Sequence, residues 1–290
     1  MRAAAVRIGK GLAMAALLAI ALGGAAPAFA KSKKPKPSTI PPEEVYAEAI
    51  GKITKKRYFA ARAMLQELLP RIPPEDRDLL PRVQLAIADA FFKDGGLTNY
   101  GESLNAYRNF LTYFPQHPQA AYAQLMVGQS LYRQVTAPDR DQTTTIKAID
   151  ELRKVQTGWP GTPEAQEAQA VTELCNNRLA EKERLVGAFY QKRKVWLAAL
   201  DRYQKVTENY PRYPGMSRLL LDLGKVYLAI NQREQAQDAF TRLAARDGSK
   251  KLSNEAETAL KAYDRRREKE GENLYGGLSD KDKKPNGTKP

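Results

Sequence analysis

A pattern of one small and two large apolar residues recurs five times along the chain, and each copy ends in a helix-breaking residue. The large residues follow the small one by four and seven positions, and proline or glycine stands at position twelve. The copies are Ala61/Leu65/Leu68/Pro73, Ser103/Tyr107/Phe110/Pro115, Ala148/Leu152/Val155/Pro160, Ala199/Tyr203/Val206/Pro211 and Ala236/Phe240/Leu243/Gly248. Residues spaced by four and seven share one helix face, and proline or glycine ends a helix. The pattern therefore predicts five helices that each approach a neighbour closely.

A looser pattern precedes each copy, in which a small residue follows a bulky one and a large, mostly aromatic residue comes three positions later. It reads Leu220/Leu223/Gly224/Tyr227, Val186/Gly187/Tyr190, Val127/Gly128/Leu131, Leu85/Ala88/Phe91 and, most weakly, Tyr46/Ala49. Two such helices in tandem are typical of the tetratricopeptide repeat. We therefore predict an all-α protein, a right-handed superhelical array of about five tetratricopeptide (TPR) hairpins. Ala256, Leu260 and Tyr263 predict a C-terminal capping helix.

The repeat spacing sets the domain boundaries. We place the repeat domain at residues 43–269, with hairpins at about 43–74, 78–117, 118–162, 163–213 and 215–248 and the cap at 252–269. The small anchors lie farther apart than the about 34 residues of one repeat unit. The extra residues predict an insertion around 136–145 in the third hairpin. They also predict a lengthened first helix in the fourth, from about Pro163 to Tyr190.

The N-terminal thirty residues have the features of an export signal. A basic start is followed by the apolar stretch Gly11–Gly24, and Ala28-Phe29-Ala30 supplies a cleavage site after Ala30. An uncleaved anchor is the alternative, although the apolar stretch is shorter than the about 20 residues of a membrane span. A lipoprotein signal would end in cysteine, and the single cysteine is Cys175, so we expect no lipid anchor by that route.

Two further segments are predicted to lack fixed structure. Residues 31–42 are a basic linker rich in lysine and proline. Residues 270–290 are rich in polar residues and glycine, so we expect a disordered tail.

Charge and residue types narrow the functional classes. The chain carries a net charge of +14, which suits nucleic acid, acidic proteins or anionic membranes. Export argues against nucleic acid, and a merely solvated basic surface is the alternative. With one histidine, His117, and one cysteine, and with no carboxylate pair that stands apart from the helix surface, the sequence offers no catalytic constellation, metal cluster or cofactor motif. We expect a protein that is not an enzyme.

A stacked array offers a groove lined by the first helix of each hairpin. The residues that we place on this face are Tyr46, Ile50, Arg82, Phe92, Tyr122, Tyr132 and Arg133. Aromatic rings beside arginine suit an extended peptide, since the rings take apolar side chains and the guanidinium takes carboxylates. The alternative is that some of these rings pack between repeats.

Three segments resemble the BamD family of outer-membrane assembly proteins. They are "YRNFLTYFP" at Tyr107–Pro115, "DRDQTTTIKAI" at Asp139–Ile149 and the stretch Leu179–Pro211. The resemblance covers about residues 43–245. The Asp-Arg-Asp-Gln insertion is specific, because generic tetratricopeptide proteins lack it.

The resemblance implies a periplasmic scaffold at the inner face of the outer membrane. It implies that the C-terminal half binds a BamA-type partner beside other assembly subunits, and that the N-terminal repeats bind unfolded outer-membrane proteins. The implied partner contacts are Asp139, Arg140, Asp141, Gln142, Arg193 and Arg202, and the implied substrate contacts are Tyr46, Phe92, Tyr122, Tyr132 and Arg133. Familiar members are lipoproteins, so we expect this chain to reach the membrane peripherally, through its partner. The alternative is another periplasmic TPR adaptor, in envelope constriction or pilus biogenesis.

Overall fold

The computed structural model describes residues 40–246 and 250–276, the last six of these in backbone only. The helices in this part of the chain are α1 (Pro42–Thr54), α2 (Tyr58–Leu68), the 3-10 turn η1 (Leu69–Arg71), α3 (Leu79–Asp94), α4 (Leu97–Tyr113), α5 (Ala120–Tyr132), α6 (Thr143–Gly158), α7 (Pro163–Lys192), α8 (Trp196–Asn209), α9 (Met216–Ala229), α10 (Arg233–Arg246) and α11 (Lys250–Gly276). No strand occurs among these residues. The predicted export signal and nearly all of the linker lie outside them.

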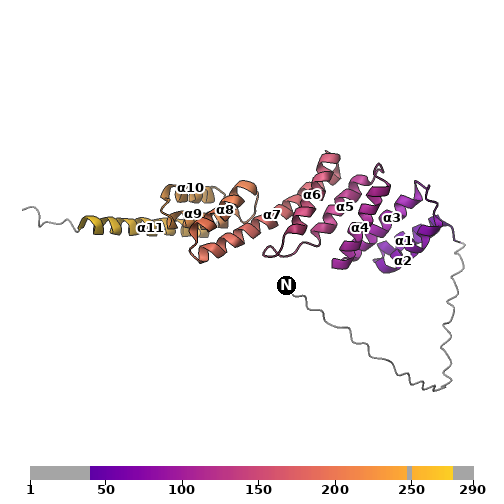
Figure 1. Cartoon of the computed structure of the whole chain (residues 1–290), viewed down its shortest axis with the longest axis horizontal. Coiled ribbons are helices and arrows are strands. Elements are labelled where there is room, and N and C mark those ends of the chain that lie inside the picture. The colour runs from indigo at the N-terminus through magenta and orange to yellow at the C-terminus, as the bar shows by residue number, and fades with distance from the viewer. Residues whose placement is uncertain (1–39, 247–249, 277–290) are drawn as a thin grey trace, which may run out of the picture. The chain divides into compact units, whose positions relative to one another are not determined.

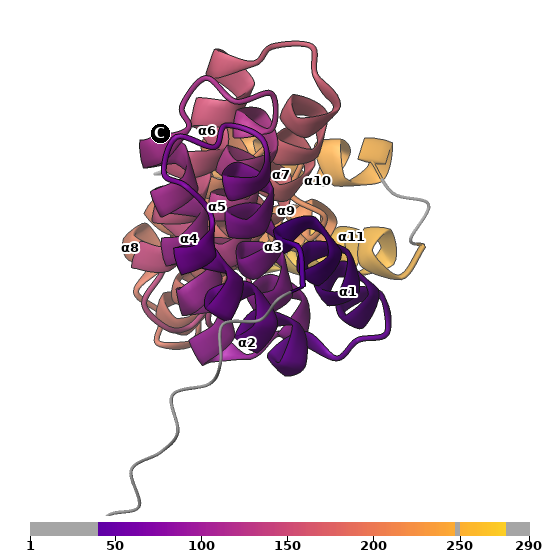
Figure 2. The same cartoon turned by 90° about the vertical axis from the view of Figure 1, so that its right-hand side faces the viewer.

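The helices form antiparallel pairs in chain order (Figure 1). Contacts join α1 to α2, α3 to α4, α5 to α6, α7 to α8 and α9 to α10, and each pair also contacts the next. Seen from the end, successive helices stack behind one another (Figure 2). The predicted all-α array of helical hairpins is confirmed. No helix in the described ranges combines the length and apolar character needed to span a membrane.

The repeated anchor residues form the contact within each hairpin. All fifteen small and large apolar anchors are buried, and the most exposed of them, Phe240, is 6% exposed. In three hairpins the first-helix glycine leaves no room for a side chain. A Cβ would lie 2.6 Å from Leu152 at Gly128, 2.4 Å from Tyr203 at Gly187 and 2.2 Å from Phe240 at Gly224. The small residues of the looser pattern are therefore present because the partner helix fills their side-chain space.

The second helices end in a common way before their prolines. Phe114, Trp159 and Tyr210 each donate a backbone hydrogen bond to the residue four positions earlier. Each then leaves the helical region, with φ between −131° and −136°. The next residue is proline, whose ring disfavours helical geometry at the position before it. The helix therefore stops one residue ahead of each proline.

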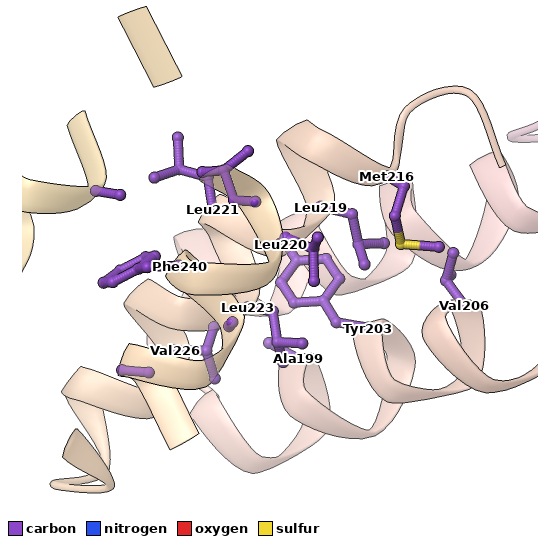
Figure 3. Packing of buried hydrophobic residues seen from close by; sticks show 14 of the residues in the cluster. Ala199, Tyr203, Val206, Met216, Leu219, Leu220, Leu221, Leu223, Val226 and Phe240 are labelled. Carbon is purple, nitrogen blue, oxygen red and sulfur yellow. The ribbon is translucent and has the colours of Figure 1, made fainter. Parts of the chain in front are cut away.

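The largest core cluster lies among the C-terminal helices. Figure 3 shows Tyr203 and Val206 of α8 pointing toward Leu220 and Met216 of α9. Burying large apolar side chains stabilises a protein by about 1.5–3 kcal/mol each. This cluster is thus a major source of stability in the C-terminal hairpins.

Helix α7 is twice as long as its neighbours in the array. It begins with Pro163 after Thr162, whose hydroxyl accepts a hydrogen bond from the Ala165 amide at 3.2 Å. It packs on α5 and α6 first and on α8 and α9 further along. Cys175 is fully buried in it, and burial raises the thiol pKa to about 11. The predicted lengthening of this helix is confirmed.

The end of the chain corrects one prediction. The disordered tail was predicted to begin at residue 270, but α11 continues to Gly276. Arg266 and Arg267 each form an ion pair with Glu270 one turn on, and such pairs support a helix. The predicted cap itself packs through Ala256 and Tyr263, which are buried. The rest of the tail lies outside the described residues.

Candidate protein-binding surfaces

Two aromatic–arginine pairs lie on first helices of the N-terminal hairpins. The guanidinium of Arg82 on α3 lies 4.6 Å from the ring centroid of Tyr46 on α1. Glu43 and Asp78 hold it there, each through a 3.0 Å ion pair. Ile50, one turn beyond Tyr46, is partly buried, and both side chains pack against the core cluster formed by α1, α2 and α3. The structure therefore brings these three predicted groove residues onto one part of the surface.

The second pair joins α3 to the end of α5. Arg133 lies 5.9 Å from the ring centroid of Phe92, and Tyr100 meets that ring edge-on at 5.6 Å. Arg133 is exposed, whereas Phe92 is half-buried. A ring with a guanidinium above it suits an apolar side chain beside a negative charge.

The other two predicted groove tyrosines pack within the array. The Tyr122 hydroxyl donates to Asp89 at 2.8 Å, and Tyr107 donates to the same carboxylate oxygen at 2.5 Å. Burial, followed by the charge of Asp89, raises the pKa of Tyr122 well above its usual range. Tyr132 packs against a core cluster that includes Leu131. For these two rings the structure favours packing between repeats over a place in an open groove.

The predicted insertion forms the α5–α6 loop, residues 133–142. Gln142 is 2% exposed, and its amide donates to the carbonyls of Ala137 at 2.8 Å and Arg140 at 3.1 Å. Its amide oxygen accepts a bond of 2.7 Å from the Thr145 hydroxyl. Direct contact between Gln142 and a partner protein is thus ruled out in this conformation, because its polar atoms are already hydrogen-bonded to the loop and to the first turn of α6. Gln142 shapes the loop.

The other insertion residues lie at the surface. Asp141 accepts from the backbone and hydroxyl of Thr143, at 3.3 and 2.9 Å, at the start of α6. Asp139 and Arg140 are exposed. Their side chains make no hydrogen bond or ion pair within the part of the chain that the structure describes. The loop therefore presents one acid and one base side by side from a fixed backbone.

The two predicted basic contacts occupy different surroundings. Arg193, in the turn between α7 and α8, is exposed and lies 3.7 Å from the Phe189 ring centroid. Arg202 on α8 pairs with Glu183 at 2.9 Å, and this hydrogen bond raises the arginine's pKa. Arg193 is free to meet a partner carboxylate, whereas Arg202 would have to share or exchange its partner.

The sequence reasoning missed an apolar surface around Arg193. Phe189 is 52% exposed, Val195 47% and Leu197 71%. With Arg193 and the neighbouring Lys194 they form what we call the α7–α8 tip. The sequence does contain a signal for this surface, because Phe189, Val195 and Leu197 are apolar residues that lie outside the anchor positions. Exposed apolar side chains among cations are typical of protein interaction surfaces.

The fold and these surfaces together indicate the class of protein. Helical hairpins in tandem, arginine-bearing aromatic surfaces and a shaped polar loop are typical of repeat proteins that bind other proteins. No group of His, Cys, Asp and Glu residues able to hold a metal ion occurs in residues 40–246 and 250–276.

Comparison with known proteins identifies the family. The model of the YfiO family, described as "Outer membrane lipoprotein", matches residues 38–243. Since this match spans more than half of the chain, the protein belongs to that family, which is the BamD family of the sequence resemblance.

Curated relatives agree with the family match. The chain is 26% identical over 233 residues to outer membrane protein assembly factor BamD of Rickettsia prowazekii, covering 80% of this chain and 89% of that one. It is 30% identical over 138 residues to BamD of Caulobacter vibrioides, covering 48% and 45%. With BamD of Vibrio cholerae it shares 26% over 182 residues, covering 59% and 73%. The predicted family resemblance is confirmed.

Proposed function

We propose that this protein is a non-enzymatic periplasmic scaffold of outer-membrane protein assembly. Membership of a family whose curated relatives are named assembly factors supports this role. We place it at the inner face of the outer membrane, in complex with a BamA-type protein and other assembly subunits.

The α5–α6 loop is the observation that carries the proposal. A buried glutamine with three hydrogen bonds is more than a passive connection needs, because a surface turn can satisfy its backbone with water. The hydrogen bonds and burial of Gln142 offset the entropy cost of ordering the loop, so the loop keeps one shape. We propose that Asp139 and Arg140 meet a partner here, as the family resemblance implies.

The C-terminal half offers a second partner contact, the α7–α8 tip. We propose that Arg193 forms an ion pair at an interface whose apolar part covers Phe189 and Leu197. Arginine and aromatic residues are enriched in such interfaces. Arg202 is the lesser contact, since Glu183 already occupies its guanidinium.

The N-terminal repeats are proposed to bind unfolded outer-membrane protein segments. The Tyr46–Arg82 and Phe92–Arg133 pairs offer rings for alternate apolar side chains of an extended chain. Tyr122 and Tyr132 support the surface from within.

Co-purification from envelope extract tests the assembly role. We expect the tagged protein to recover a BamA-type protein, and Asp139→Ala/Arg140→Ala to recover less of it. The matched control is Asp150→Ala/Arg153→Ala, which removes an exposed ion pair of 3.5 Å on α6 and leaves the loop intact. Recovery of a cell-division or pilus complex without the BamA-type protein would show that the adaptor alternative is correct.

Attachment to the membrane through the partner is tested separately. We expect the protein to leave the membrane fraction when the BamA-type protein is depleted. Persistent membrane association after depletion would contradict this part of the proposal and leave the assembly role standing.

A further inference from the structure

The turn between α1 and α2 presents a group of cations beside an exposed aromatic ring. Lys55, Lys56 and Arg57 are all exposed, and Phe59, the second residue of α2, is 77% exposed. We call these four residues the α1–α2 tip. Their side chains make no hydrogen bond, ion pair or ring contact within the part of the chain that the structure describes. None of them belongs to the surfaces proposed above.

The backbone of the α1–α2 tip is fixed although its side chains are free. The Lys56 amide donates to the Ile53 carbonyl at 2.9 Å, and the Arg57 amide donates to the Lys52 carbonyl at 2.8 Å. Lys56 has φ +58°, in the left-handed region. The amide of the buried anchor Ala61 donates to the Arg57 carbonyl at 3.0 Å, which ties the turn to the core. The cations therefore project from a turn of fixed shape.

No carboxylate neutralises the α1–α2 tip. The sequence has no Asp or Glu between Glu48 and Glu67, and this stretch holds five cations. One of them, Lys52, forms an ion pair of 2.6 Å with Glu48. A second, Arg62, forms an ion pair of 2.8 Å with Asp94 of α3. The three cations left without a carboxylate are those of the tip, so their positive charge is uncompensated.

The neighbouring α3–α4 turn extends this surface. Arg62 of α2 donates to the Ala90 carbonyl of α3 at 3.2 Å, so the start of α2 lies beside the end of α3. Lys93 is exposed and forms no ion pair among the described residues, and Leu97, which begins α4, is 72% exposed. The two adjoining turns therefore both combine cationic side chains with an exposed large apolar side chain.

The residue types in the α1–α2 tip favour a lipid surface over a protein partner. Lysine is a flexible, strongly hydrated point charge, and it is depleted in protein interfaces, whereas arginine is enriched there. The α7–α8 tip has the arrangement typical of a protein contact, because Arg193 is stacked 3.7 Å from the Phe189 ring centroid. Lipid phosphates need no such fixed geometry, and the acyl boundary beneath them accepts an apolar side chain such as that of Phe59.

We propose that the α1–α2 tip binds the surface of a membrane that contains anionic lipids, with its three cations at the headgroup phosphates and Phe59 in the interface below them. Each cation near such a surface is worth about fivefold in affinity. Three cations and one ring give a reversible contact rather than a stable anchor. The tip therefore orients a chain that its partner holds at the membrane, and the depletion experiment above keeps its expected result. This orienting role rests on the proposed function, whereas the lipid binding itself does not.

Sedimentation with vesicles tests the proposal. The full mature chain is mixed with vesicles of phosphatidylethanolamine and phosphatidylglycerol, or with vesicles of phosphatidylcholine alone, which carry no net charge. We expect saturable binding to the anionic vesicles only. The variant Lys55→Gln/Lys56→Gln/Arg57→Gln should bind about a hundredfold more weakly, because three cations are lost.

The matched control removes the same charge from the other end of the array. Lys250→Gln/Lys251→Gln/Arg265→Gln neutralises three exposed cations of α11 and should bind nearly as the wild type does. The lysines of residues 31–42 are present in every variant, so they contribute equally and do not affect the comparison. Far-UV circular dichroism like that of the wild type shows that each variant is folded.

A second set of variants tests the ring. Phe59→Ser keeps the charges and should bind anionic vesicles about tenfold more weakly, because no ring enters the apolar boundary. The emission added by Phe59→Trp should shift to shorter wavelengths on anionic vesicles. The signal of Trp159 and Trp196, measured in the wild type, is subtracted first.

The outcomes separate this inference from the assembly role. Equal binding of the wild type and the α1–α2 tip variant, an equal loss in the α11 control, or no binding of the wild type to anionic vesicles would overturn the proposal. The assembly role would stand in each case, because it is tested by recovery of the BamA-type protein. Unchanged vesicle binding with reduced recovery of that protein would make the α1–α2 tip a protein contact instead.

Discussion

The third and fifth hairpins share a packing solution but join their helices differently. In both, a glycine of the first helix faces a large anchor of the second, Gly128 with Leu152 and Gly224 with Phe240. The fifth hairpin connects its helices through a short turn in which Asn231 has φ +59°, a conformation that asparagine tolerates. The third uses the ten residues of the α5–α6 loop, built around buried Gln142. The glycine contact sets how the helices meet, so the connection is free to change in length and chemistry.

The largest effect is expected where an anchor itself is changed. Ala199 is fully buried beside the first helix of its hairpin. Ala199→Trp should destabilise the protein by more than about 3 kcal/mol, because the indole cannot fit between the two helices. Urea unfolding followed by circular dichroism measures this. Melting like that of the wild type would refute the assignment of the anchor positions.

The next effect compares the two glycine contacts directly. Gly224→Ala puts a methyl group 2.2 Å from the rigid Phe240 ring, whereas Gly128→Ala puts one 2.6 Å from Cγ and Cδ2 of Leu152, a side chain with more rotatable bonds. We expect losses of about 2 and about 1 kcal/mol in the free energy of unfolding. Thermal unfolding of the two variants under the same conditions gives the ranking. A greater loss at Gly128 would mean that the side-chain flexibility of Leu152 does not relieve the clash.

A smaller loss of stability is expected when the α5–α6 loop is changed. Gln142→Ala leaves the Thr145 hydroxyl and two loop carbonyls without their partner. We expect a loss of about 1–2 kcal/mol, with faster amide hydrogen exchange confined to residues 133–145. Asn231→Gly is the control in the short turn and should change stability little, since glycine adopts positive φ freely. Uniformly faster exchange across the array would contradict a local role for Gln142.

The smallest effect on stability is expected from the exposed side chains of the α5–α6 loop. Asp139→Ala/Arg140→Ala removes two exposed side chains and should change the free energy of unfolding by less than about 0.5 kcal/mol. The same variant is expected to weaken partner recovery. Separating the two readouts, stability and binding, distinguishes a binding loop from a structural one. A stability loss comparable to that of Gln142→Ala would place these side chains in the structural group.

The sequence predicted the anchors well because their signal is local. A spacing of four and seven places Leu65 and Leu68, or Tyr203 and Val206, on one face whatever surrounds them. The prolines fixed the helix ends for an equally local reason. The length of α7 followed from counting residues between anchors.

The site was harder to predict because side-chain pairing, whether within a loop or between hairpins, leaves no periodic signal in the sequence. Tyr122 is drawn inward by Asp89, which belongs to the preceding hairpin, and no local pattern indicates that pairing. By its polarity Gln142 is expected at the surface, yet its amide has two partners in the loop and one in the first turn of α6, and it is buried.

Helix α7 runs for thirty residues without a break. The number of residues in it therefore sets the angle, about the helix axis, between the elements packed at its two ends. Near its start Ala168 packs with Leu125 of α5 and Leu152 of α6, and further along Ala180 packs in the cluster formed with α8 and α9. One residue added or removed between these two contacts rotates everything that follows by about 100° around the helix axis. A hairpin loop can take up an inserted residue by becoming longer. A deletion within α7 would instead change the direction in which the α7–α8 tip faces relative to the α5–α6 loop. The number of residues in this helix is therefore as constrained as their identity.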